Sequence, residues 1–155
     1  LDGKDQSLVQ TSLFLGIEMD PLKDNPQQGD FLIRNIMGAD KESGGVQVGA
    51  MLREGQLVQF HLRDKDMSSE DLRLVLNRYK AKEHSKKAAG ALLFSCLGRG
   101  QYLYGKPNHD SDMFHDQLGD IPLGGFFCNG EIGPVGETTF LHGYTSSFGI
   151  FHPTH

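Results

Sequence analysis

The chain has 155 residues, which at about 150 residues per domain most simply form one domain. Hydrophobic residues make up 37% of it, and its 20 glycines and 6 prolines stay well below the share typical of low-complexity chains, so a disordered protein is excluded. The formal net charge is −5 and no basic block offsets it, which argues against a nucleic-acid partner, because such binding requires clustered Lys and Arg.

The longest apolar run is too short to cross a membrane. It covers residues 88–97, includes Gly90 and Ser95, and is about half the length of a membrane-spanning helix. No secretory signal pattern opens the sequence, and two cysteines are too few for a disulfide scaffold. These features predict an intracellular, cytoplasmic protein with no membrane span.

The first third of the chain predicts β-strands. Mostly apolar runs cover Leu13–Met19 and Phe31–Met37, and shorter alternating patterns cover Val46–Val48 and Leu57–Leu62. Glycine, proline and aspartate separate these runs, as in turns. Four short strands at this spacing predict an antiparallel meander, with one face of the sheet in water.

A helix is predicted next. An apolar stripe of helical period is formed by Leu72, Val75, Leu76 and Tyr79. Ser68 stands at a suitable N-cap position, and Asp71 follows three residues later, as in a variant of the capping box. The sequence therefore predicts a helix that begins after Ser68.

The last third mixes strands with a second helix. Leu92–Leu97 predicts a buried strand, and residues 108–118 predict a helix with Asp110 or Ser111 at its cap. Its expected inward residues are Met113, Phe114 and Leu118. After Pro122 the chain is rich in glycine and aromatic residues, which favours strands. The predicted fold class is α+β, a mostly antiparallel sheet with two helices packed on one face.

Two glycine-rich stretches, Cys96–Gly100 and Gly124–Gly133, are candidates for a binding site. Each places the end of a predicted strand against a glycine turn, and ligand groups commonly converge on loops at strand ends. Each also carries one charged residue, Arg99 or Glu131. The alternative is that both are tight turns, with Arg99 and Glu131 solvated or paired with each other.

The sequence gives no sign of a cofactor or a metal. Neither glycine-rich stretch has the dinucleotide or P-loop pattern. His109 and His115 are six positions apart, which puts them on different faces of a helix, so a metal site is not expected there. We predict no cofactor, no metal and no catalytic residue.

Cys96 is nevertheless the best candidate for a nucleophile. Such a role would need Arg99 to lower the pKa of its thiol and His142 to act as the base. The ordinary role of a free cysteine is packing in the core. We therefore expect Cys96 to react faster than Cys128 with a thiol probe, without any catalytic turnover.

Three segments, Phe94–Gly100, Ile121–Pro134 and Phe140–Phe148, resemble the C-terminal domain of the FIST family, named for F-box and intracellular signal transduction proteins. The resemblance covers about residues 10–152 of the single predicted domain, 1–155. It implies a non-enzymatic sensory domain that binds a small, amino-acid-like ligand. The family's N-terminal FIST half is absent from residues 1–155, so that half or another protein is an expected partner. Similarity to cyanobacterial and plant-type members adds a plastid as an alternative location.

The resemblance and the glycine-rich stretches together give a predicted ligand site. Arg99 is expected to pair with a ligand carboxylate, since its guanidinium matches that group in shape. Asn129 and Glu131 are expected to take an ammonium or amide end, and Phe126 or Phe127 to form an apolar wall. The full predicted set is Cys96, Arg99, Gly100, Phe126, Phe127, Asn129, Gly130, Glu131 and His142. The alternative function is a protein-interaction module, either the substrate-recognition part of an F-box ubiquitin-ligase adaptor or a structural subunit of a larger assembly.

Overall fold

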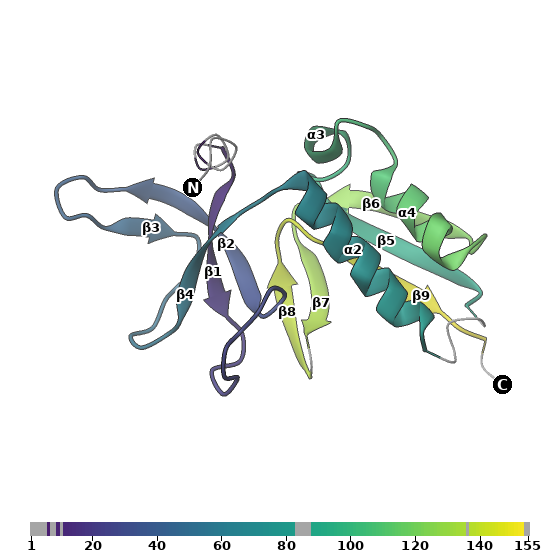
Figure 1. Ribbon diagram of the computed structural model, residues 1–155, viewed down its shortest axis with the longest axis horizontal. Helices are drawn as coiled ribbons and strands as arrows, with labels where there is room; N and C mark the ends of the chain where they lie inside the picture. The colour runs from purple at the N-terminus through teal and green to yellow at the C-terminus, as the bar shows by residue number, and fades with distance from the viewer. Residues whose placement is uncertain (1–5, 7–8, 10, 83–87, 136, 154–155) are drawn as a thin grey trace. The chain divides into compact units, whose positions relative to one another are not determined.

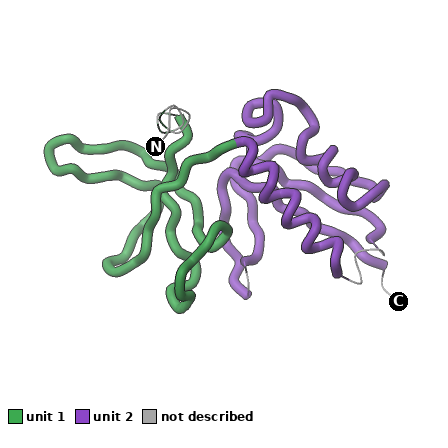
Figure 2. Tube along the Cα trace, viewed as in Figure 1, with its two compact units in different colours: residues 1–64 green, residues 65–155 purple. Residues whose placement is uncertain are grey.

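The computed structural model describes residues 6, 9, 11–82, 88–135 and 137–153. The chain divides into two compact units, unit 1 with residues 1–64 and unit 2 with residues 65–155 (Figure 2). Length predicts one domain over residues 1–155 and does not reveal this division. Each unit is therefore described by itself.

Unit 1 is an antiparallel sheet. Its strands are β1 (Leu13–Glu18), β2 (Phe31–Ala39), β3 (Val46–Val48) and β4 (Val58–Leu62), in the order β3-β2-β1-β4 (Figure 1). The four predicted strands and their antiparallel pairing are confirmed. The meander is correct only from β1 to β3, because β4 returns to pair with the other side of β1. Because β4 pairs with β1, β1 is a central strand of the sheet. This position agrees with its mostly apolar sequence and with the burial of residues Phe14–Ile17.

Unit 2 combines helices with strands. Its described helices are α2 (Lys65–Lys80), α3 (Gln101–Tyr104) and α4 (His109–Leu118), and its described strands are β5 (Gly90–Cys96), β6 (Leu123–Cys128), β7 (Glu131–Val135), β8 (Thr138–His142) and β9 (Ser146–Phe151). β5 pairs with β6 in parallel and with β9 antiparallel, while β7 and β8 form a separate hairpin. α2 and α4 lie over one face of the β6-β5-β9 sheet (Figure 1). The predicted α+β fold class is thus confirmed.

Helix α2 begins earlier than predicted. Its first residue is Lys65, so Ser68 lies inside the helix and the capping prediction is wrong. The physical reason is that Asp64, directly before the helix, is as favourable a residue type for an N-cap as serine. Leu72 and Leu76 are buried as expected.

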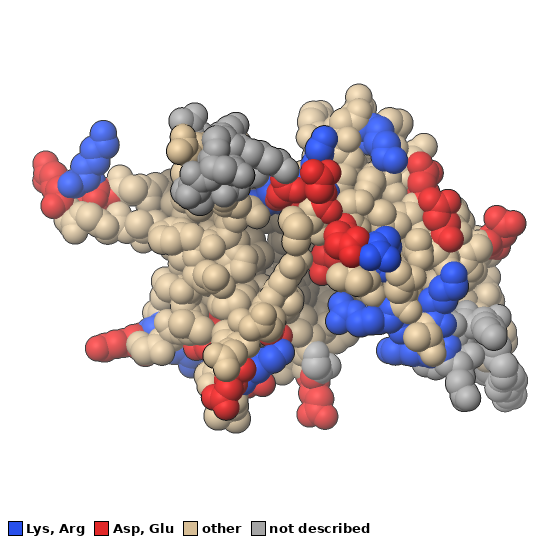
Figure 3. All heavy atoms as spheres, in the orientation of Figure 1, with Lys and Arg blue, Asp and Glu red and all other residues tan. Residues whose placement is uncertain are grey.

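The charges of α2 follow the helix dipole. Asp66 lies in its first turn, and Arg78 and Lys80 lie in its last turn, where basic side chains gather in Figure 3. Of the predicted apolar stripe, Leu72 and Leu76 are buried, whereas Val75 is exposed, so the stripe is narrower than expected. Among the described residues, no helix has the length and apolar character needed to cross a bilayer.

The core of unit 2 lies between the two long helices and the sheet. Its buried residues are Leu72, Leu76, Ala91 and Phe114, with Met113, Leu118, Ile121, Leu123, Phe148 and Ile150 packed around them. The Phe114 ring stacks on the Phe148 ring with their centroids 5.4 Å apart. The predicted inward residues of the second helix are therefore confirmed.

The predicted cap of α4 is wrong. The helix begins at His109, and Asn108 occupies the N-cap position in a left-handed conformation. Ser111 donates a hydrogen bond from its hydroxyl to the Asn108 carbonyl. Asp110 does not cap the helix but is buried, and it becomes the centre of the site described below.

Two consecutive glycines of β6 differ in the space around them. A Cβ atom on Gly125 would run into the backbone carbonyl of Leu93, and the φ angle of this glycine is +153°. On Gly124 the nearest atom would be Leu92 Cδ2 at 3.7 Å, an ordinary contact. The clash at Gly125 involves backbone inside a strand ladder, which cannot move without disturbing the pairing of β5 and β6.

We therefore expect Gly125→Ala to lower the free energy of unfolding by about 1–3 kcal/mol, as overpacking does. The matched variant Gly124→Ala is expected to change it by less than about 0.5 kcal/mol. Urea denaturation of the two variants measures the difference. Equal effects at both positions would show that the β5–β6 backbone approach does not constrain Gly125.

Candidate functional site

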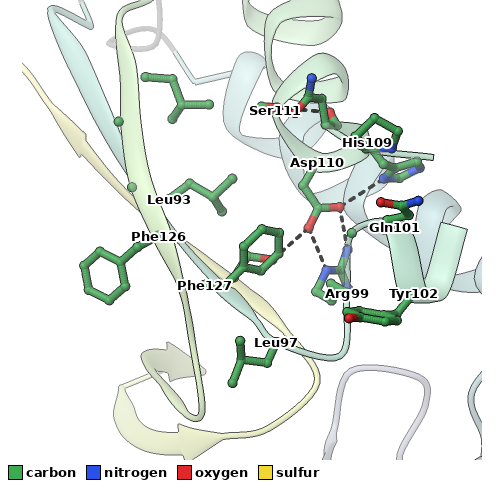
Figure 4. A pocket seen from close by; sticks show the side chains of 17 residues that line it. Leu93, Leu97, Arg99, Gln101, Tyr102, His109, Asp110, Ser111, Phe126 and Phe127 are labelled. Atoms are coloured by element: carbon green, nitrogen blue, oxygen red, sulfur yellow. Dashed lines mark hydrogen bonds and ion pairs between the residues drawn. The ribbon is translucent and has the colours of Figure 1, made fainter. Parts of the chain in front are cut away.

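A pocket of about 640 Å³ lies in unit 2, between the β5–β6 pair and the segment that carries α3 and the start of α4 (Figure 4). Strands β5 and β6 contribute Leu93, Ser95 and residues 123–127 to the pocket lining. The turn after β5 contributes Leu97, Arg99 and Gly100. The segment with α3 and the start of α4 contributes Gln101, Tyr102 and residues 107–111. All these residues belong to unit 2.

The pocket brings together part of the predicted site. Arg99, Gly100, Phe126 and Phe127 line it. Outside its lining lie Cys96, Asn129, Gly130, Glu131 and His142. The two glycine-rich stretches thus meet in space, but the second one contributes through strand β6 and not through the turn that follows it.

The floor of the pocket is a buried ion pair between Arg99 and Asp110. The guanidinium donates from Nε to Oδ2 at 2.7 Å and from Nη2 to Oδ1 at 3.0 Å, and the two side chains are only 7% and 6% exposed. Asp110 also accepts hydrogen bonds from Ser95 Oγ at 3.1 Å, Ser146 Oγ at 2.7 Å and His109 Nδ1 at 3.0 Å. Arg99, Ser95, Ser146 and His109 all donate to this carboxylate, and these hydrogen bonds stabilise its negative charge.

The two charges stabilise each other against burial. Burial alone would raise the pKa of Asp110, but the hydrogen bonds and charge of Arg99, with further hydrogen bonds from His109 and Ser146, hold that pKa far below its ordinary value of 3.8. Burial alone would lower the pKa of Arg99, but Asp110 outweighs this effect and the pKa is raised. Both groups are therefore charged at neutral pH.

His109 links this ion pair to helix α2. Its Nδ1 donates to Asp110, and in the neutral imidazole its Nε2 accepts a hydrogen bond from the Ser69 hydroxyl, with the two atoms 2.9 Å apart. The Tyr104 ring stacks on the imidazole, with centroids 3.4 Å apart, and its hydroxyl accepts from Arg99 Nη2 at 2.6 Å. The Ser69–His109–Asp110 sequence of hydrogen bonds resembles that of a serine-hydrolase triad. These hydrogen bonds connect α2 to α4. A catalytic role is not favoured, because Ser69 lies outside the pocket lining and Asp110 is paired with Arg99.

Phe127 forms the apolar wall of the pocket. It is in register with Ser95 across the parallel β5–β6 pair, so its side chain lies on the face that carries Asp110 (Figure 4). A Cβ atom on Gly100 would lie 2.9 Å from Phe127 Cζ, which shows how closely the ring covers this glycine. Phe126 also borders the pocket, but its ring turns to the opposite face of the sheet, where it meets the Phe94 ring edge-on with the centroids 5.2 Å apart. The sequence left Phe126 and Phe127 as alternatives for this wall, and the register of the strands distinguishes them.

One nitrogen of Arg99 remains available. Its Nε and Nη2 are used by Asp110 and Tyr104, and within the described part of the chain its Nη1 makes no hydrogen bond. Helix α4 begins at the same pocket, and the first N–H groups of a helix have no partner within it. The pocket therefore offers hydrogen-bond donors beside an apolar wall.

Glu131 has a different place from the one expected. It is 1% exposed, and its Oε2 accepts hydrogen bonds from the Thr145 hydroxyl at 3.0 Å and the Thr145 backbone N–H at 3.3 Å. The alternative reading, in which Glu131 is solvated or paired with Arg99, is wrong, because Glu131 holds the start of β7 against the segment before β9. His142 donates from Nε2 to the Gly133 carbonyl at 3.0 Å, within the β7–β8 hairpin. No group of three or more potential metal ligands is found among the described residues.

Comparison with known proteins gives the family. The FIST C domain matches residues 1–134. An uncharacterized protein of Mycobacterium tuberculosis is 44% identical over 147 residues, which cover 95% of this chain and 38% of that protein. F-box only protein 22 of Homo sapiens is 31% identical over 108 residues, which cover 59% of this chain and 27% of that protein. The chain spans about two fifths of the length of the mycobacterial relatives it matches. The resemblance that the sequence suggested is confirmed, and the chain belongs to the FIST C domain family.

Proposed function

We propose that unit 2 is a sensory module that binds a small organic acid, without catalysis, in the pocket above the Arg99–Asp110 pair. The observation that carries the proposal is the state of Arg99, which is 6% exposed, fixed by Asp110, and still has Nη1 available. A carboxylate is the natural partner of such a guanidinium. Phe127 beside it favours an apolar or aromatic body on the ligand, as in an aromatic amino acid or a related acid.

The site is organised before any ligand binds. Asp110 holds the guanidinium in one orientation, so little side-chain freedom remains to be lost on binding. The N-terminus of α4 adds donors for an anion. For the second polar end of an amino-acid-like ligand, the side chains of Gln101, Asn108 and Ser111 line the pocket, in place of the predicted Asn129 and Glu131.

The absence of catalysis remains part of the proposal. The Ser69–His109–Asp110 hydrogen-bond chain, which has the order of a catalytic triad, has its serine outside the pocket lining. Its carboxylate is also committed to Arg99, which weakens the support it can give to an imidazolium. Binding therefore accounts better than turnover for this arrangement.

A matched pair of probes tests the proposal. We expect 3-phenylpropanoate to stabilise the protein and 3-phenylpropanamide to do so much less, because only the acid brings a negative charge to the hydrogen bond from Arg99 Nη1. At 100 times its dissociation constant the acid should add about 2.7 kcal/mol to the free energy of unfolding. Urea denaturation with each probe measures this, and L-phenylalanine in the same assay tests the amino group.

Two variants locate the effect. Phe127→Ala removes the apolar wall and is expected to abolish most of the stabilisation by 3-phenylpropanoate. Ile132→Ala is the control, since Ile132 is 70% exposed and lies outside the pocket lining. Equal stabilisation of the protein by the acid and by the amide would count against the Arg99 site. Equal stabilisation of Phe127→Ala and Ile132→Ala by the acid would also count against it.

A second candidate function is protein interaction. The similarity to F-box only protein 22 favours it, as do exposed apolar side chains around the pocket. Tyr102 is 93% exposed, Phe127 56% and Leu97 54%. In this alternative, the substrate-recognition part of an adaptor or the remainder of a longer chain covers the same surface. Saturable binding of the acid probe by the isolated chain distinguishes the ligand site from a surface that requires a protein partner.

A further inference from the structure

The two cysteines of the chain lie opposite each other in unit 2. Cys96 is the last residue of β5, Cys128 is the last residue of β6, and the two are partners in the parallel register. Neighbouring strands are about 4.8 Å apart, so the Cα atoms fall within the range of about 4.4–6.8 Å that a disulfide spans. In-register residues of parallel strands also project from the same face of the sheet.

Both thiols are free, and their present contacts are weak. Cys96 is 7% exposed and its sulfur accepts a hydrogen bond from the Gly98 N–H at 3.4 Å. Cys128 is partly exposed and its thiol donates to Glu131 Oε1 at 3.4 Å. Arg99, which the sequence placed beside Cys96, is held by Asp110 instead. A turn with glycine follows each strand end, which leaves room for a small adjustment.

We propose that Cys96 and Cys128 are a redox-modification site, which a peroxide converts into a reversible intrachain disulfide. One thiolate attacks the O–O bond of hydrogen peroxide, forming a sulfenic acid and, after protonation, water. The second thiolate attacks that sulfur, the S–S bond forms, the S–O bond breaks, and hydroxide leaves and takes up a proton as water. The two thiols lose two electrons in total and the peroxide is reduced to two waters.

The disulfide would join the strand ends at the pocket. Leu97 and Phe127, each adjacent to one of the cysteines, line the pocket. Leu97 N–H already donates to the Cys128 carbonyl at 2.9 Å, so the two strand ends are in register up to the proposed bond. The proposal depends only on the two cysteines and stands independently of ligand binding.

Peptide mapping tests the proposal. Trypsin cleaves after Lys87 and Arg99, which places Cys96 and Cys128 on different peptides. The protein is treated with hydrogen peroxide at about pH 8.5, because the thiolate is the reacting form and burial together with Glu131 raises the pKa of Cys128. Remaining thiols are then blocked with iodoacetamide before digestion.

We expect a linked pair of peptides that dithiothreitol separates, formed at a rate independent of protein concentration. Cys96→Ser and Cys128→Ser are the matched controls, and neither can form the linked pair within one chain. Recovery of both cysteines as iodoacetamide adducts or as sulfinic acids, with no linked pair, would overturn the proposal. A linking rate that rises with protein concentration would also overturn it, because it indicates a bond between chains.

Discussion

Asp110→Asn is expected to lower the free energy of unfolding by about 3–5 kcal/mol, the usual cost of removing one partner from a buried ion pair. The substitution leaves the Arg99 guanidinium charged and buried without its counterion. It also weakens the acceptor that Ser95, Ser146 and His109 share. Urea denaturation at neutral pH measures the loss.

Two controls separate the ion pair from general effects of mutation. Asp112→Asn changes an exposed carboxylate on the same helix, and we expect a change of less than about 0.5 kcal/mol. The double variant Arg99→Met/Asp110→Leu removes the unpaired buried charge and should recover part of the stability lost in Asp110→Asn, although Ser95, Ser146 and His109 still lose their shared acceptor. A loss of the same size in Asp112→Asn, or no recovery in the double variant, would contradict the assignment of a buried pair.

The contribution of Asp110 should also depend on pH in a defined direction. Its pKa in the folded protein is far below the ordinary 3.8 of the unfolded chain, so its stabilising effect is fully present above that value. As pH falls below about 4, the unfolded state takes up a proton that the folded state does not, and the advantage of wild type over Asp110→Asn shrinks. Denaturation curves of both proteins between pH 7 and pH 3 measure this, and a difference that grows on acidification would contradict it.

Phe114→Ala is expected to cost about 3–5 kcal/mol, the typical loss for truncating a buried phenylalanine. Phe114 is 0% exposed, lies among Leu72, Leu76 and Ala91, and stacks on Phe148. The substitution leaves a cavity between α4 and the sheet that the neighbouring residues cannot fill without moving.

The matched control is Phe151→Ala, because Phe151 is 55% exposed on β9. We expect it to cost less than about 1 kcal/mol, since little of its apolar surface is removed from water. Urea denaturation measures both variants. Similar losses at Phe114 and Phe151 would mean that the core of unit 2 is not centred on α4.

Local patterns predicted most elements of this fold, and their limits are visible in particular residues. The apolar run at Leu13 predicts a buried strand, and Phe114 is inward because helical period places it there. The return of β4 to β1 and the parallel pairing of β5 with β6 were not predicted, because pairing depends on contacts between distant segments. The face that Phe127 occupies depends on the same pairing.

The candidate site was predicted only in part for a similar reason. Arg99 and Gly100 were identified from the glycine-rich turn after a strand. Asp110 was missed, because its position near a helix start favours a cap, whereas its partners Arg99, Ser95 and Ser146 are 11, 15 and 36 positions away. A histidine and an aspartate adjacent in sequence, 109 and 110, were the only local signal.

An NMR titration with 3-phenylpropanoate tests most directly whether this pocket binds an organic acid. In ¹⁵N-labelled protein, the backbone amides of Gly100, Gly125 and Ser111 lie at the pocket, and those of Gly133 and Leu141 lie in the β7–β8 hairpin outside its lining. We predict that the first three resonances shift and saturate with one dissociation constant while the hairpin resonances stay in place, and that 3-phenylpropanamide shifts them far less. No shift at high concentrations of the acid, or shifts confined to the hairpin or to unit 1, would contradict the proposed site.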